Sequence, residues 1–194
     1  MAPKADRPKQ SQTIVLGHSS MTKALIANMV SLSMLVEGGA SAPLRDETTA
    51  NPQDDEIVVF RDFFIAGLRF PVDPVFVNIL HLYGMYMHQL TPNCFIRLIL
   101  YFWLAKTYDF IPTAEGFAYI HKVHYQSKTV SPLEEDGQEG EAQYGCYTFV
   151  YREFVFGPVM AYHNKWEDWT SFWFYHKVPL DPATGTQPLH GEEN

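Results

Sequence analysis

Two proline-containing helix starts constrain the fold of this 194-residue chain more than any other feature. They are Asp73–Pro74 and Thr91–Pro92, and each is followed by apolar residues at helical spacing. The capping side chain accepts a hydrogen bond from a free N–H, and proline in the first turn lacks an N–H that would otherwise have no partner. The pattern therefore predicts one helix from Asp73 to Tyr83 and a longer one that begins at Thr91.

Three more helices are expected around these two. Helical patterns cover 22–38, where two glycines should end the helix, and 56–67, which ends at another glycine. A shorter helix should begin at Pro112 with Thr113 and run through Phe117. The helix that begins at Thr91 is apolar on nearly all sides, which predicts burial at the centre of the domain.

Beyond Tyr119 the pattern changes to β-rich segments at 120–130, 144–156 and 170–178. Helices followed by strands, without regular alternation, favour the α+β class. We therefore expect an N-terminal cluster of about five helices followed by a small antiparallel β-sheet. The predicted organisation is a disordered tail over 1–20, a single domain over 21–180 and a flexible tail over 181–194.

Charge argues against a strong nucleic-acid binder. The net charge is −8 and the pI is about 5.4, which opposes the basic field that non-specific binding requires. Much of the negative charge lies at 134–141, however, and segment 57–130 is slightly basic. Weak nucleic-acid binding therefore stays open as an alternative. Its candidate contacts are Arg97, Lys106, Lys122 and Lys128.

Cysteine use and hydropathy indicate where the protein acts. Cys94 and Cys146 form neither a C-x-x-C pair nor a cysteine-rich framework, which is typical of a reducing compartment. The apolar run at 24–36 is too short for a membrane span, which needs about 20 residues. We expect a protein of the cytoplasm or nucleus, neither secreted nor inserted in a membrane.

The sequence lacks the motifs of the main catalytic classes. Neither a G-x-x-x-x-G-K-[ST] nor a G-x-G-x-x-G phosphate loop occurs, and no cofactor is predicted. A two-metal nuclease needs carboxylates that converge on divalent ions. Here they are scattered among caps and surface positions: Asp62, Asp73, Asp109, Glu115, Glu153, Glu167 and Asp168. The sequence therefore predicts a non-enzyme with no evident small-molecule substrate.

Histidine spacing offers weak hints of a metal site. His121 and His124 have a spacing that metal ligands use, but no Cys or carboxylate pair completes a set. We interpret them as structural polar residues at a helix-to-strand junction. His81 and His88 are separated by Gly84, which should break the helix between them. No metal site is predicted.

Two further patterns have a structural and a functional interpretation. Cys146 could meet His163 or His176 as a nucleophilic pair, but no local signature surrounds the thiol, and a structural cysteine is preferred. The second pattern is an aromatic series that could stack on single-stranded bases, although alternating aromatic residues in a strand more often form core. It comprises Trp166, Trp169, Phe172, Trp173, Phe174 and Tyr175.

Three segments carry a family resemblance. EIVVFRDFFIAGLRFPVDP (56–74), HQLTPN (88–93) and FWLAK (102–106) resemble the plant "putative transposase, gypsy-type domain" family. YGCYTFVYRE (144–153) and NKWEDWTSFWFYHKV (164–178) are similar to the sheet-forming, Trp-rich end of its members. The resemblance covers most of the chain, and its motifs are structural signatures without a catalytic set.

The resemblance implies a protein encoded by, or descended from, a plant retrotransposon, from a region near its Gag-like end. It implies a non-enzymatic assembly or protein-interaction module whose partners are copies of itself or other element-encoded proteins. The alternative is a weak nucleic-acid-binding module of the same mobile element.

Overall fold

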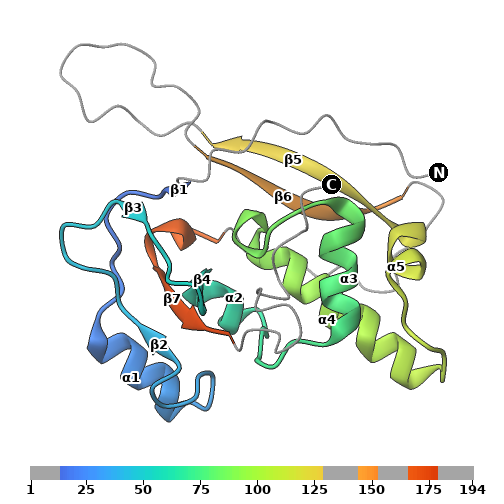
Figure 1. The fold of residues 1–194 in the computed structure, drawn as a ribbon. Coiled ribbons are helices and arrows are strands. Elements are labelled where there is room, and N and C mark those ends of the chain that lie inside the picture. The colour runs from blue at the N-terminus through green and yellow to red at the C-terminus, as the bar shows by residue number, and fades with distance from the viewer. Residues whose placement is uncertain (1–13, 129–143, 153–165, 179–194) are drawn as a thin grey trace.

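The computed structural model describes residues 14–128, 144–152 and 166–178 (Figure 1). Within these residues, helices and strands alternate irregularly along the chain. In order they are β1 (Ile14–Val15), α1 (Lys23–Ser31), β2 (Ala40–Ser41), β3 (Thr49–Ala50), β4 (Glu56–Phe60), α2 (Arg61–Ile65), α3 (Pro74–Tyr83), the 3-10 turn η1 (Met87–Gln89), α4 (Pro92–Thr107), α5 (Ala114–Ile120), β5 (His121–Lys128), β6 (Tyr144–Tyr151), the 3-10 turn η2 (Trp169–Ser171) and β7 (Trp173–Lys177).

The α+β class is confirmed, but the predicted order of elements is wrong. The described residues contain five α-helices, and strands β1 to β4 lie before and among them instead of after them. The strands form three small antiparallel sheets, with orders β1-β3, β2-β7-β4 and β5-β6. Figure 1 shows the three-stranded sheet beside α1, with α3, α4 and α5 on the other side and the β5-β6 hairpin above them.

Strand β4 replaces the first half of the helix that was predicted over 56–67. Ile57, Val58, Val59 and Phe60 are all buried, and the strand pairs with β7 from Glu56↔Lys177 to Phe60↔Trp173. A short continuous apolar run fits a fully buried strand as well as a helix, and its β-branched residues favour the strand. Only the second half, α2, is helical.

The helix starts were predicted more accurately than the helix ends. Helix α3 has Asp73 as its N-cap and ends at Gly84, as expected, with Gly84 in the left-handed conformation. Helix α1 begins after Thr22 as expected but ends at Ser31, well before Gly38. Ser33 takes the left-handed φ of 57° that lets the chain leave this helix. A glycine was therefore not needed to end it.

Residues 14–20, which were assigned to the disordered tail, contact strands β3 and β7. Ile14 pairs with Ala50 across β1-β3. The Trp173 indole N–H donates to Gly17 O at 3.0 Å, and the Ser19 hydroxyl donates to Trp173 O at 2.6 Å. These bonds satisfy polar groups beside a buried strand, so the ordered part of the domain begins earlier than predicted.

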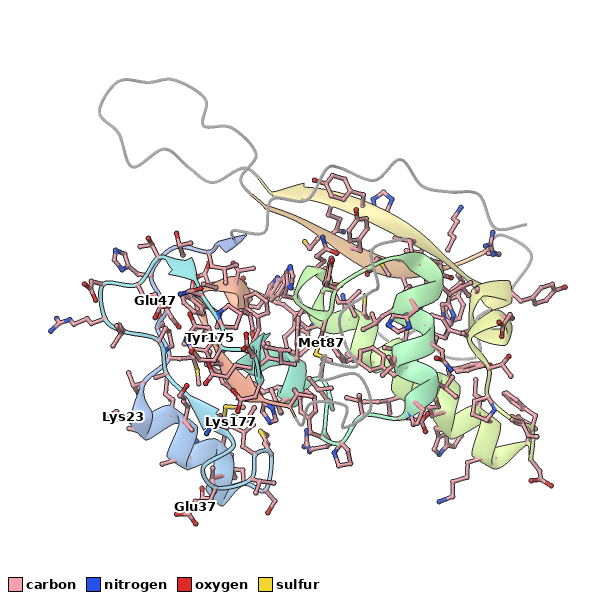
Figure 2. The ribbon with its side chains drawn as sticks, in the orientation of Figure 1. Lys23, Glu37, Glu47, Met87, Tyr175 and Lys177 are labelled. Atoms are coloured by element: carbon pink, nitrogen blue, oxygen red, sulfur yellow. The ribbon has the colours of Figure 1, made fainter. Side chains whose placement is uncertain are left out.

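The C-terminal aromatic series forms core. Trp169, Trp173, Phe174 and Tyr175 are buried, and the Phe60 ring contacts that of Trp169 edge-on at 4.7 Å. Tyr175 also fastens the 42–51 loop to β7, because its hydroxyl donates to Glu47 Oε1 and accepts from the Asn51 N–H (Figure 2). The core interpretation of these aromatic residues is confirmed for the buried members.

Candidate interaction surface

The start of α4 shows how this helix is anchored. Thr91 is the N-cap, as predicted, but its side chain makes no capping hydrogen bond. Thr91 is buried, and its hydroxyl lies 3.6 Å from the Cys94 thiol, which donates to Tyr147 O at 3.3 Å. The Thr91 N–H donates to the same Tyr147 O at 2.9 Å. The Tyr147 carbonyl oxygen of strand β6 therefore holds the start of α4 through two hydrogen bonds.

Helix α4 is buried on one side only, which corrects the prediction that this helix is buried at the centre of the domain. Its inward positions are Pro92, Cys94, Phe95, Leu98, Tyr101 and Ala105. In contrast, Ile99 is 42% exposed and Trp103 is 56% exposed. These two residues are four apart and share a face, which is partly exposed to solvent.

The loop after α4 is held firmly against the helix. The Phe110 N–H donates to Ala105 O at 3.0 Å. The Tyr101 hydroxyl donates to Thr113 O at 3.0 Å and accepts from the Thr113 N–H at 3.1 Å. Both ends of the loop are therefore bonded to α4.

This firmly held loop nevertheless exposes large apolar side chains. We define the apolar tip as Trp103, Tyr108, Phe110 and Ile111, whose exposed fractions are 56%, 73%, 43% and 86%. The tip lies at the C-terminal end of α4 and in the loop to α5, at the lower right of Figure 1. Clustered exposed apolar residues mark interaction sites more often than singly scattered ones. The sequence contains a signal for this tip. Three large apolar residues, Tyr108, Phe110 and Ile111, lie just before Pro112 and outside any helical pattern.

A shallow groove of about 550 Å³ lies next to the tip, between α3 and α5. Its lining residues are Val75, Asn78, His81, Leu82, Pro112, Thr113, Ala114 and Glu115. The Thr113 hydroxyl accepts from the Gly116 N–H at 3.0 Å and so caps α5, as the sequence predicted. The groove was not predicted, because it depends on how α3 packs against α5.

The candidate nucleic-acid contacts do not form one surface on α4. Arg97 and Lys106 are nine residues apart, and at about 100° per residue they lie on opposite sides of the helix. The Arg97 guanidinium lies over the Tyr151 ring at 4.7 Å. Lys122 is exposed near the start of β5. Lys128 ends that strand, and its side chain lies outside the described part of the molecule.

His121 lies at a helix-to-strand junction, as predicted. His121 ends α5 and begins β5, and its ring stacks on Phe117 at 4.1 Å. Burial lowers the pKa of His121 to about 4, and nearby Arg97 adds to this effect, although the bond to Phe117 O opposes it. His124 is exposed on the opposite face of the strand, so the two rings do not converge.

The two thiols and His176 are buried. Burial raises the pKa of the Cys94 thiol, which disfavours the nucleophilic thiolate. Cys146 is buried in β6, whereas His176 lies in β7 of another sheet. His163 falls outside the described residues. Burial lowers the pKa of His176 to about 4, and its ring stacks on Phe70 at 4.1 Å.

The carboxylates occupy separate positions. Asp62 is buried and accepts from the Arg61 side chain at 2.7 Å, while Asp73 caps α3 and Glu115 lies in the first turn of α5. Glu153 lies outside the described residues. Within the three described ranges, no group of three or more His, Cys, Asp or Glu is placed to hold a metal ion. The helices in those ranges also include none that is long and apolar enough to cross a bilayer.

Comparison with known proteins gives one match. A family model described as "Putative gypsy type transposon" matches residues 57–125. This segment is therefore similar to that transposon family. It runs from β4 through most of β5 and contains the apolar tip and both helices of the groove. No curated protein and no solved structure matches the chain. The match confirms the transposon part of the resemblance, whereas plant origin stays a prediction.

Proposed function

We propose that this transposon-derived domain is a non-enzymatic protein-interaction module, which contacts its partners through the apolar tip. The module would serve assembly of element-encoded proteins, as in a Gag-like region of a plant element. The observation that carries the proposal is the exposure of Trp103 near the end of α4, and of Tyr108 and Ile111 on the loop that α4 holds in place.

Rigid exposed aromatic residues are well suited to binding. Aromatic residues are enriched at the centres of protein interfaces, where they bury a large area at a small cost in side-chain entropy. The fixed loop further reduces the ordering that binding would require. A nucleic-acid site would instead need cations on one face, and Arg97 and Lys106 lie on opposite sides of α4.

Salt dependence tests the proposal against its nucleic-acid alternative. Protein–protein association should be measured by analytical ultracentrifugation, and duplex DNA and RNA binding by fluorescence titration, across one salt series. Association through apolar surface should persist or strengthen as salt rises, because screening reduces repulsion between acidic chains. Nucleic-acid binding through phosphate contacts should weaken by about 0.9 log units per contact for each log unit of salt.

A substitution at the tip supplies the matched comparison. Trp103→Gln should weaken association by more than about tenfold, since it removes a large apolar contact. Val36→Asp is the control, because Val36 is 73% exposed on the turn between α1 and β2, away from the tip. Submicromolar nucleic-acid affinity at physiological salt, together with a strictly monomeric protein, would favour the alternative. Metal-dependent DNA nicking that one carboxylate substitution abolishes would contradict a non-enzymatic module.

A further inference from the structure

We propose that the groove between α3 and α5 receives Ile111 from a second copy of this chain, so that two copies form a symmetric dimer. The inference rests on the proposed function and names the partner of the apolar tip. In the proposed dimer, the tip of each copy contacts the groove of the other copy.

The covalent structure favours this arrangement. Ile111 is 86% exposed, whereas the next residue, Pro112, lines the groove. Neighbouring Cα atoms are about 3.8 Å apart, so the projecting side chain and the groove are immediate neighbours on the surface. A two-fold axis beside this peptide bond brings each Ile111 over the groove of the other copy. Such isologous contacts are the commonest way in which soluble proteins form dimers.

The groove suits an aliphatic side chain. Val75, Leu82 and Pro112 provide apolar walls, and Leu82 is itself 42% exposed. Burying such surfaces against Ile111 removes apolar area from water on both copies. The position of Pro112 is fixed because the next residue, Thr113, makes two hydrogen bonds with the Tyr101 hydroxyl. The site is therefore formed before a partner arrives.

Charge also favours a second copy as the partner. The whole chain has a net charge of −8, yet from Leu98 to His121 the only charged side chains are Lys106, Asp109 and Glu115. This face thus contributes little repulsion between copies, and the remaining charge is screened over about 8 Å at physiological salt. Lys106 is exposed beside the loop, and Glu115 is exposed at the groove. The symmetric dimer can place each lysine near the glutamate of the other copy.

The first experiment measures the dimer dissociation constant by sedimentation equilibrium for the wild-type chain and two variants. Ile111→Asp should raise the constant by more than about tenfold, because the symmetry places each new carboxylate against the apolar walls of a groove that also contains Glu115. Val36→Asp adds the same charge away from the face and should leave the constant within about twofold. Circular dichroism should show that both variants keep the wild-type secondary structure. If Ile111→Asp fails this check, Ile111→Ser replaces it with the same expected direction.

The second experiment tests the pairing between copies by charge exchange. Lys106→Glu and Glu115→Lys should each weaken dimerisation, since each variant places like charges together twice. An equimolar mixture of the two variants should form a heterodimer more tightly than either variant dimerises alone. The doubly substituted chain should regain most of the wild-type affinity, because its opposite charges again face each other.

The outcomes separate this inference from the proposed function. In one outcome Trp103→Gln weakens the dimer, Ile111→Asp does not change its dissociation constant, and the mixed variants show no preference for the heterodimer. This outcome supports the interaction module and overturns the pairing of Ile111 with the groove. A wild-type chain that stays monomeric at all accessible concentrations also overturns the pairing. Recovery in both the mixture and the double variant, together with loss in Ile111→Asp, supports it.

Discussion

In the described residues three threonines serve as helix N-caps, but only two of them accept a hydrogen bond from the helix. Thr22 and Thr113 are exposed, and their hydroxyls accept from the N–H groups of Leu25 and Gly116. Thr91 is buried and makes no capping bond, although it occupies the same position relative to its helix. Sequence reasoning treats the three alike, because the burial that separates them comes from strand β6.

This difference predicts two unequal effects on stability. Thr113→Val removes the acceptor of the Gly116 N–H and should lower the free energy of unfolding by about 1 kcal/mol. Thr91→Val keeps the buried shape and loses only a weak contact with the Cys94 thiol, so it should change that free energy by less than about 0.5 kcal/mol. Urea unfolding followed by circular dichroism compares the two. Equal losses in both variants would contradict the distinction.

Among the helices and strands, those with signals in their own few residues could be predicted from the sequence, whereas those that depend on distant residues could not. Helix α3 was predicted correctly at both ends because its signals, Asp73 and Gly84, act within a few residues. Strand β4 was missed because its identity depends on β7, which lies far along the chain. The candidate surface depends partly on local sequence and partly on packing between distant residues. Apolar residues before Pro112 were visible in the sequence, but neither their exposure nor the groove was.

The contact between α4 and α5 requires a glycine. A Cβ atom at Gly116 would lie 2.6 Å from the Tyr101 hydroxyl oxygen, which is closer than van der Waals contact permits. Gly116→Ala should therefore destabilise the protein, although alanine normally favours a helix by about 1 kcal/mol. In a Tyr101→Phe background that oxygen is gone and only the Thr113 hydroxyl oxygen, 3.1 Å from the added Cβ, stays close, so the same substitution should destabilise the protein less than it does in the wild-type chain. A double-mutant cycle of unfolding free energies measures this coupling, and simple additivity would count against the contact.

Across the whole molecule, the described residues include two buried histidines that lie in different sheets. His176 lies in the three-stranded sheet, and His121 lies where α5 meets the β5-β6 hairpin. Their side-chain nitrogens His176 Nδ1 and His121 Nε2 are buried without a hydrogen-bond partner. Each ring is stacked on a phenylalanine, so a proton on either ring would place a charge among aromatic side chains.

These histidines predict acid sensitivity. In the folded protein both have a pKa of about 4, below the ordinary value of 6.5, so the unfolded chain takes up protons first as the pH falls. Their contribution to stability is complete above about pH 6.5 and is lost as the pH falls towards 4, at about 1.4 kcal/mol per pH unit for each group. His176→Phe keeps the stacking and removes one titrating group. Urea midpoints between pH 7 and 4 should therefore fall less steeply in this variant, and an unchanged slope would contradict the assignment.

The central position of β7 has a consequence for the order of events during synthesis. Strands β2 and β4 both pair with β7, which emerges from the ribosome long after them. Until then, the apolar run from Ile57 to Phe60 has no sheet to join, and such unpaired segments aggregate readily. Segment 57–125, which matches the transposon family, contains β4 without β7. A nascent or truncated chain that stops before Trp173 should therefore depend on chaperones for its solubility.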